Sequence, residues 1–369
     1  MSRIYKHLFG PVPSRRLGKS LGVDLVPHKL CPIDCVYCEV GPTTQKTIER
    51  REYVPVEEVL EEVRAKLAEN VPIDIITLSG SGEPTLHSGV GRVIRGIKEM
   101  TRLPVAVLTN GNLLYDPQVR RDILPADLVL PSLDAGDAET YARINRPCEQ
   151  ATFERLIAGL KAFRAEYPGR IRLEVFFVAG INDTADQARK IRSLIDQIKP
   201  DQIDVNSIAR PPAEPDARAV PFERLGELAA ILGDKAEVIA SRPRQEQESG
   251  IGNRESGKHS QAADAQSAPT QIPVSRPPNP ESRLPIPDSQ IPIPDPRFPI
   301  PDSQLPTPAS VSPDAVLALL RRRGCRAEDV AKGLSAPRER IDQLLADLVA
   351  RHLVTRQQRP DGEYFVIAG

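Results

Sequence analysis

Hydrophobic residues up to about residue 240 occur in two patterns that alternate along the chain. Short runs of mainly apolar residues predict buried strands at 22–26, 73–78, 104–108, 128–133, 171–178, 203–208 and 236–240. Longer amphipathic stretches predict helices at 56–67, 90–100, 153–165, 185–198 and 222–232. Continuously apolar strands separated by helices are typical of a parallel sheet covered on both faces. We therefore predict an α/β fold, a partial (β/α)6 TIM-like barrel, with a doubly wound open sheet as the alternative.

Proline marks the next segment of the chain. Residues 241–312 hold 15 of the 37 prolines, and Pro-Ile-Pro-Asp recurs at Pro285, Pro292 and Pro299. Such dense proline removes backbone donors and blocks both helices and central strands. We predict a disordered, partly polyproline-II linker, with a ligand for an aromatic-grooved domain as the less favoured interpretation. The predicted domains are therefore a barrel at 1–240, the linker at 241–312 and a small domain at 313–369.

The last segment predicts helices at 314–323, 327–333 and 337–352, followed by strands at 353–356 and 364–367 around a turn at 360–362. This order resembles a winged helix-turn-helix, with Ser335 as a helix cap. From Asp314 onward, ten Lys and Arg face eight Asp and Glu, although Arg321–Arg323 form a basic cluster. A committed DNA reader has a stronger basic footprint, so a protein target is slightly favoured over a nucleic acid and both stay open.

Charge and composition narrow the classes of protein. The net charge of −1 gives no global basic field for nucleic acid. No apolar run approaches the ~20 residues needed to cross a bilayer, and Met1–Pro11 lacks the features of a signal peptide. We expect a cytoplasmic protein with no membrane partner. In that reducing compartment, clustered cysteines are metal ligands more often than disulfides.

Three of the five cysteines, Cys31, Cys35 and Cys38, share one short loop after the first predicted strand. Three soft thiolates suit an iron–sulfur cluster or zinc. His28 could complete a zinc site, but structural zinc usually takes its ligands as two separated couples. An iron–sulfur cluster with one open iron is therefore preferred, with zinc or purely structural cysteines as alternatives. A small molecule that carries both an amine and a carboxylate can chelate an open iron.

The spacing C-x3-C-x2-C, with Tyr37 just before the last cysteine, resembles the signature of the radical SAM superfamily, over roughly residues 9–240. The resemblance implies a [4Fe-4S] cluster on Cys31, Cys35 and Cys38, and S-adenosylmethionine on the open iron. It further implies reductive cleavage to methionine and a 5′-deoxyadenosyl radical that takes a hydrogen atom from a substrate. An electron donor such as flavodoxin or ferredoxin would supply the electron.

Further cofactor-binding candidates follow the predicted strands, and Tyr37 is counted with them. The loop after the second strand contains Ser81, Gly82 and Glu83, and resembles the family's Gly-Gly-Glu segment, which holds the methionyl ammonium. Ser81 replaces the first glycine of that segment. The next strand ends carry Asn110, Ser132 and Asp134, which the resemblance assigns to the ribose or carboxylate of the cofactor. Capping of turns is an equally open interpretation of these three residues.

Charged residues in unexpected places give weaker hypotheses. Glu174 lies within an apolar strand, so it contacts cofactor or substrate or forms a structural salt bridge. Arg15 and Arg16 either pair with a substrate carboxylate or phosphate or lie in a solvated loop. Residues 141–147 are interpreted as a loop near the substrate, and the following Cys148 as an inert thiol rather than a catalytic one.

Residues 9–27 and 206–212 resemble, more loosely, the branch related to the wyosine-base synthases that modify tRNA. Those enzymes carry extra cysteines ahead of the core, whereas this chain has none before Cys31, which argues against the same reaction. We predict a radical SAM enzyme whose C-terminal module recruits an RNA or protein target; no catalytic residue is assigned. The alternatives are an iron–sulfur redox or metal sensor with a winged-helix output domain, and a zinc-stabilised structural protein.

Overall fold

The computed structural model describes residues 5–14, 16–239, 311–320, 324–334, 336–359 and 362–368. Several predictions fall outside these residues: the linker except Val311 and Ser312, Arg15, the Arg321–Arg323 cluster, the cap Ser335 and the turn residues Pro360 and Asp361. They remain predictions from the sequence.

Within the described residues, an eight-stranded sheet with the order β1-β2-β5-β6-β7-β8-β9-β10 forms the centre of the N-terminal part. Its strands are β1 (Leu8–Ser14), β2 (Gly18–Val23), β5 (Ile75–Leu78), β6 (Val105–Thr109), β7 (Leu128–Pro131), β8 (Arg170–Phe177), β9 (Gln202–Ser207) and β10 (Ala236–Val238). Only β1 and β2 pair antiparallel within this sheet; the later neighbours are parallel. The fold is α/β, a partial TIM-like barrel, as predicted.

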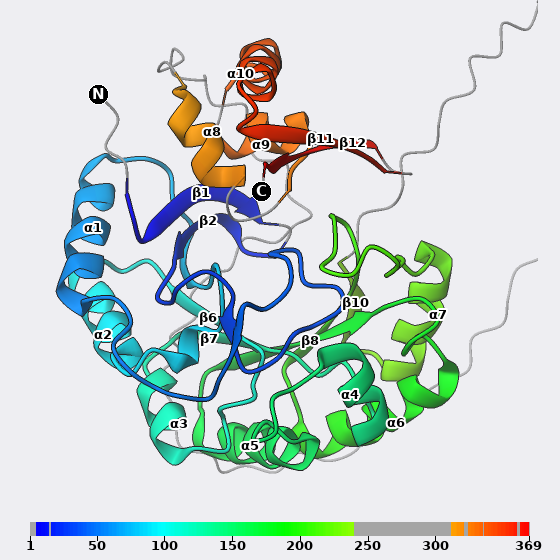
Figure 1. Ribbon diagram of the computed structural model, residues 1–369. Coiled ribbons are helices and arrows are strands. Elements are labelled where there is room, and N and C mark those ends of the chain that lie inside the picture. The colour runs from blue at the N-terminus through cyan, green and yellow to red at the C-terminus, as the bar shows by residue number, and fades with distance from the viewer. Residues whose placement is uncertain are drawn as a thin grey trace, which may run out of the picture. The chain divides into compact units, whose positions relative to one another are not determined.

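The helices of this part are α1 (Val56–Ala68), α2 (Val90–Met100), α3 (Pro117–Ile123), α4 (Ala138–Asn145), α5 (Phe153–Glu166), α6 (Ala185–Ile198) and α7 (Phe222–Leu232). Figure 1 shows α1, α2, α3, α5, α6 and α7 following one another around the outside of the curved sheet. Each buries one apolar stripe, which in α2 consists of Val93, Ile94 and Ile97. Strands β5, β6 and β7 are mainly apolar because the helices cover their outer side and the barrel interior lies on their inner side, whereas β8 and β9 also carry Arg172, Glu174, Asp204 and Asn206.

Some predicted elements differ from the structure. The first parallel strand begins at Gly18 rather than Gly22, and the antiparallel strand β1 before it was not predicted. Pro11 and Pro13 argued against a strand there, but β1 is an edge strand, where missing N–H donors are tolerated. The predicted loop at 141–147 is wrong for its first five residues, which belong to α4. Asp137 caps this helix by accepting a hydrogen bond from the Thr140 N–H.

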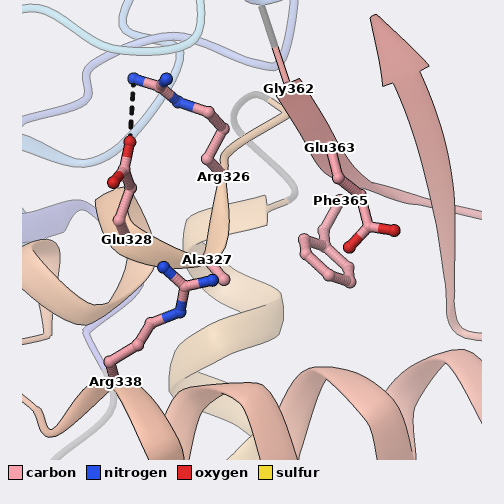
Figure 2. Close-up of a pocket in the computed structure, with 7 residues that line it drawn as sticks. All are labelled: Arg326, Ala327, Glu328, Arg338, Gly362, Glu363 and Phe365. Atoms are coloured by element: carbon pink, nitrogen blue, oxygen red, sulfur yellow. Dashed lines mark ion pairs between the residues drawn. The ribbon is translucent and has the colours of Figure 1, made fainter. Parts of the chain in front are cut away.

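The described C-terminal residues form three helices and an antiparallel strand pair in the predicted order. These elements are α8 (Pro313–Leu320), α9 (Ala327–Gly333), α10 (Arg338–Ala350), β11 (Val354–Arg359) and β12 (Gly362–Ile367). They share a hydrophobic core of their own, which includes Val316, Val330, Ile341 and Leu345. A pocket of about 250 Å³ lies between α9, α10 and β12, and its charges are balanced, with Arg326 paired to Glu328 at 3.2 Å (Figure 2). The winged-helix interpretation stays a prediction.

Among the described residues, no helix has both the length and the apolar character that a membrane span requires.

Candidate cluster and cofactor site

The cysteine loop begins in β3 (Leu30–Cys31), which pairs with the short strand β4 (Gln45–Lys46). Two backbone hydrogen bonds fasten the loop to the C-terminal end of α4. The N–H groups of Asp34 and Val36 donate to the carbonyls of Asn145 and Ile144, at 2.8 and 3.0 Å. The path of the loop is therefore fixed by an element more than a hundred residues later in the chain.

Each of the three cysteine sulfurs accepts a hydrogen bond from a different side chain. The pairs are Lys29 Nζ to Cys38 Sγ (2.9 Å), Asn110 Nδ2 to Cys31 Sγ (3.3 Å) and Asn145 Nδ2 to Cys35 Sγ (3.3 Å). The donors come from the segment before β3, the end of β6 and the end of α4. N–H donors favour the sulfur in its thiolate form, which is the form that binds metal.

Burial acts in the opposite direction on the Cys31 and Cys35 thiols. It raises the pKa of Cys31 to about 12, with a smaller contribution from the nearby Glu83 carboxylate. Burial likewise raises the pKa of Cys35 well above its usual range. Three thiols on one short loop, of which Cys35 is buried and Cys31 and Cys38 are half-buried, each accept one N–H donor, which fits a site in which bound iron supplies the missing positive charge.

A single zinc ion and a cluster place different demands on these cysteines. Among the described residues, no three His, Cys, Asp or Glu side chains are grouped to hold one metal ion. A mononuclear zinc site completed by His28 requires all four ligands to converge on a single ion. The cysteine ligands of a [4Fe-4S] cluster bind separate irons and need no such convergence.

Glu83 lies beside this loop and is 2% exposed. Its Oε1 accepts hydrogen bonds from Thr85 N (3.1 Å), Thr85 Oγ1 (2.6 Å) and Thr109 Oγ1 (2.7 Å). Its Oε2 accepts from Asn110 N at 2.8 Å. Burial raises the pKa of Glu83, and these four hydrogen bonds oppose that rise. The carboxylate is thus held rigidly, and Oε2, with one bond, can accept another donor.

Ser81 and Gly82 join the glutamate loop to the cysteine loop. Lys29 N donates to Ser81 O at 2.6 Å, and Glu83 N donates to Leu30 O at 3.0 Å. A Cβ at Gly82 would lie 2.2 Å from Leu30 O, so only glycine permits this contact. The predicted close approach therefore exists, but its partner is the chain's own backbone. The Ser81 hydroxyl donates to Asp24 and anchors the loop.

Tyr37 and Asp134 are occupied by other protein groups. The Tyr37 ring stacks on Phe176, with centroids 3.9 Å apart, and its hydroxyl donates to Asp134 Oδ2 at 2.5 Å. Asp134 also accepts from Asn145 Nδ2 (2.8 Å) and Phe176 N (3.0 Å). Burial raises the pKa of Asp134 to about 6 against these hydrogen bonds. Asp134 thus fixes the orientation of the Asn145 amide, which also donates to Cys35.

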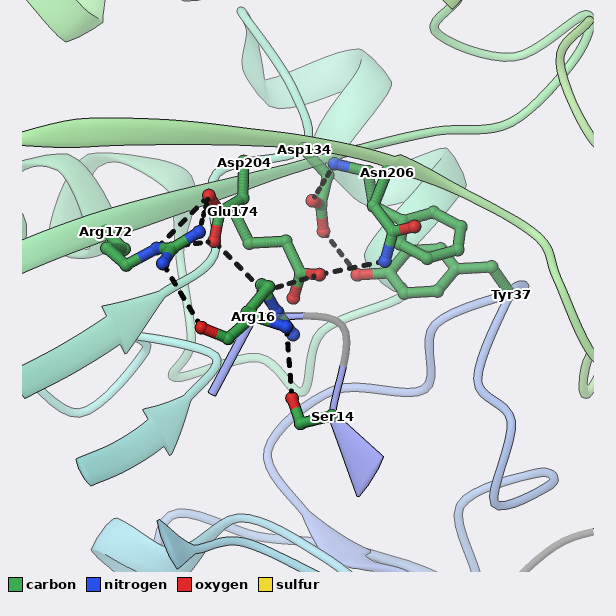
Figure 3. Close-up of polar contacts among 9 residues, drawn as sticks. Ser14, Arg16, Tyr37, Asp134, Arg172, Glu174, Asp204 and Asn206 are labelled. Carbon is green, nitrogen blue, oxygen red and sulfur yellow. Dashed lines mark hydrogen bonds and ion pairs between the residues drawn. The ribbon is translucent and has the colours of Figure 1, made fainter. Parts of the chain in front are cut away.

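Glu174 lies within a second polar group on the inner face of β8 and β9 (Figure 3). Its Oε1 pairs with Arg16 at 3.1 Å and accepts from Asn206 Nδ2 at 3.0 Å. Arg16 also contacts Asp204 at 3.4 Å, and Arg172 pairs with Asp204 at 2.7 Å. Glu174 thus forms the salt bridge that was one of its two interpretations. Arg16 does not lie in a solvated loop, because it is largely buried against two protein carboxylates. Ser132 forms an isolated bridge with Glu174 at the end of β7.

The sequence predictions did not include Lys29, and they placed Asn145 only within the 141–147 segment expected near a substrate, not beside Cys35. Lys29 is two positions before Cys31, which is a signal that was available. Asn145 follows from no spacing rule, because α4 and the cysteine loop meet only in the folded chain. The same meeting brings Cys148 beside the loop, where its N–H donates to Pro32 O at 2.8 Å.

Comparison with known proteins agrees with these features. Residues 25–195 match the family model described as "Radical SAM superfamily". The chain is 36% identical over 228 residues to the UPF0026 protein MJ1312 of Methanocaldococcus jannaschii, covering 61% of this chain and 71% of that protein. It is 40% identical over 220 residues to a protein of Brachyspira hyodysenteriae named GTPase Obg, of which the match covers 32%. That match thus spans about a third of its relative's length and 60% of this chain.

Among solved structures, TYW1 with a lysine-pyruvate adduct aligns with a TM-score of 0.45 and 19% identity, over 61% of this chain and 75% of that one. From the family match and the M. jannaschii relative, we conclude that this chain belongs to the UPF0026 family and carries a domain of the radical SAM superfamily.

Proposed function

We propose that the protein is a radical SAM enzyme, in which Cys31, Cys35 and Cys38 hold three irons of a [4Fe-4S] cluster and S-adenosylmethionine occupies the fourth. The observation that carries this proposal is the group of three cysteine sulfurs, each with its own N–H donor, next to a buried and immobilised glutamate. When bound, the cluster supplies an electron that cleaves S-adenosylmethionine to methionine and a 5′-deoxyadenosyl radical.

Glu83 is the proposed partner of the methionyl ammonium. Its Oε2 has a free lone pair, and four donors prevent the carboxylate from turning away. The contact of Leu30 with Gly82 keeps Glu83 and Cys31 on adjacent segments. A ligand held between Glu83 and the cluster would have its amine oriented before any chemistry begins.

The remaining candidates divide into contact and support roles. Ser132, half-buried at the end of β7, and the exposed side of Asn110 are proposed to contact the cofactor. Tyr37, Asp134 and Ser81 are proposed to position the loops, since each already has protein partners. Burial of Ile33, Cys35 and Val36 keeps water from part of the cysteine loop.

The substrate is proposed to be an RNA or protein, recruited by the C-terminal elements and joined through the 241–312 linker. Flavodoxin or ferredoxin is the proposed class of electron donor. The domain limits 1–240, 241–312 and 313–369 belong to the same proposal.

The test is an anaerobic assay of the full chain after reconstitution with iron and sulfide. Reduced protein is incubated with S-adenosylmethionine, and 5′-deoxyadenosine and methionine are measured together. We expect equimolar formation of both products, abolished in the Glu83→Ala variant. A protein with an intact cluster that forms neither product would instead act as a sensor, and the proposal would be wrong.

A further inference from the structure

Lys29 is buried to an unusual degree for a lysine, with 3% of its surface exposed. Its backbone adopts φ = 57°, a left-handed conformation that glycine or asparagine reaches at lower cost. Nothing in the backbone geometry therefore favours a lysine here. The reason for a lysine at this position must therefore lie in the contacts of its side chain.

The partner of that side chain is a thiol. Lys29 Nζ donates to Cys38 Sγ at 2.9 Å, and among the described residues no carboxylate lies within ion-pair distance of it. A buried cation without a counter-charge is strongly unfavourable. The thiolates of the cysteine loop are the negative charges at hand, so the buried lysine is explained by a metal-loaded site.

The two amide donors, Asn110 and Asn145, are each held in one orientation by a further hydrogen bond. Asn145 Nδ2 also donates to Asp134 Oδ2 at 2.8 Å, which fixes the rotation of its amide. Asn110 is fixed by Glu83, which accepts its backbone N–H, and by Asn112, whose N–H donates to Asn110 Oδ1 at 2.9 Å. The N–H groups are thus aimed at Cys35 and Cys31 before any cluster binds. Residues that orient around the ligands of a metal in this way tune its properties.

We propose that Lys29, Asn110 and Asn145 form a three-donor set, one for each cysteine ligand, that raises the reduction potential of the cluster, with Lys29 contributing most. This inference rests on the proposed function. Reduction adds a negative charge to the cluster, and a buried cation and N–H dipoles directed at the sulfurs stabilise that charge. The set would bring an intrinsically low potential within reach of a biological electron donor.

The test is the midpoint potential of the reconstituted full-length protein, measured by EPR-monitored redox titration without S-adenosylmethionine. Lys29→Gln keeps an N–H donor but removes the charge, and Lys29→Met removes both. We expect Lys29→Gln to lower the one-electron reduction constant at least about tenfold, which corresponds to about 59 mV. Lys29→Met should lower it further, and Asn110→Ala should lower it by a smaller factor.

Lys46→Met is the matched control, because Lys46 is exposed and pairs with Cys31 in the β3–β4 register. It removes the same charge from a neighbouring but solvated position, so its potential should stay at the wild-type value. If Lys29→Met fails to load a cluster, Lys29→Gln decides the question. An unchanged or raised potential in a loaded Lys29→Gln protein overturns the inference. Wild-type protein that takes up no [4Fe-4S] cluster instead overturns the proposed function.

Discussion

The two polar groups inside the barrel satisfy their charges in opposite ways. On the inner face of β8 and β9, Arg16 and Arg172 meet Glu174 and Asp204, so two cations balance two anions without any ligand. At the cysteine loop, a buried lysine and two amides all donate toward sulfur. The charges of the first group balance within the protein, whereas in the second we propose that a bound metal holds the sulfurs as thiolates and so provides the charge that Lys29 faces.

Charge balance therefore distinguishes the two polar groups better than burial does. Asp204 and Glu83 are both buried carboxylates, Asp204 within β9 and Glu83 at the start of the short 3-10 helix Pro84–Leu86. Asp204 is neutralised by two guanidinium groups, while Glu83 is held by neutral hydroxyl and amide donors and has no ion-pair partner among the described residues. A cationic ligand group is the natural partner of the second arrangement.

The largest expected effect follows from removing a cluster ligand. Cys31→Ala should reduce the iron content of anaerobically reconstituted protein from about four atoms per chain to nearly none, because two cysteines cannot hold the cluster. Iron and acid-labile sulfide are measured on the purified full chain. Cys148→Ala is the matched control: its backbone also lies beside the loop, yet its iron content should be that of the wild type. Equal losses in both variants would contradict the assignment of the ligands.

The next largest effect concerns the polar group on β8 and β9, in which Arg16 and Arg172 pair with Glu174 and Asp204. Asp204→Ala leaves Arg16 and Arg172 buried with less counter-charge, and should lower the free energy of unfolding by about 3–5 kcal/mol. Urea unfolding followed by circular dichroism measures this loss. Asp196→Ala breaks an exposed pair with Arg192 and should cost only about 0.3–0.5 kcal/mol. A small loss for Asp204→Ala would show that the β8–β9 group is not a structural unit.

A third variant tests the uncompensated carboxylate. Glu83→Gln keeps the shape of the side chain but removes its charge, and should weaken S-adenosylmethionine binding about 10- to 100-fold, as expected for a charge-assisted hydrogen bond of about 1.5–3 kcal/mol. Equilibrium binding to the loaded protein measures the change. Glu174→Gln serves for comparison, because its carboxylate already pairs with Arg16, and should change the affinity less than about threefold. An equally large loss would place Glu174 in the cofactor site.

The smallest effect lies outside both groups, at the cap of α4. Hydrogen bonds from the Thr140 N–H, Lys190 and Gln187 hold the pKa of Asp137 below its usual range, although partial burial acts the other way. Its stabilisation is therefore present above the unfolded-state pKa of about 3.9 and is lost as the pH falls through the lower folded-state pKa. Asp137→Ala should cost about 1 kcal/mol at pH 7. In urea unfolding, the difference from wild type should shrink below pH 4; a constant difference would contradict this account.

Periodicity predicted most of the barrel because its strands and long helices are regular. The predicted limits of 90–100, 185–198 and 222–232 are those of α2, α6 and α7. Strand ends shifted by one to a few residues, since β-branched runs do not mark where pairing stops. α3 and α4 were missed because seven- and eight-residue helices carry little periodic signal.

The candidate site residues could likewise be predicted only where the signal in the sequence is local. Cysteine spacing and the Gly82–Glu83 pair are local, so the sequence alone pointed to them. The support roles of Tyr37 and Asp134 depend on Phe176 and Asn145, which approach only through the fold. From the sequence alone, Glu174 could either contact cofactor or substrate or form a salt bridge. Its partner Arg16 comes from the turn between β1 and β2, so only the fold brings the two together.

The central claim, that three cysteines leave one iron open for S-adenosylmethionine, is tested most directly by electron–nuclear double resonance on the reduced, reconstituted protein. S-adenosylmethionine labelled with ¹⁵N in its amine and ¹⁷O in its carboxylate is added to one sample and omitted from the other. The account predicts that the EPR signal shifts on addition and that both labelled nuclei couple strongly to the cluster. A cluster whose signal ignores S-adenosylmethionine, with neither label coupled, would contradict it.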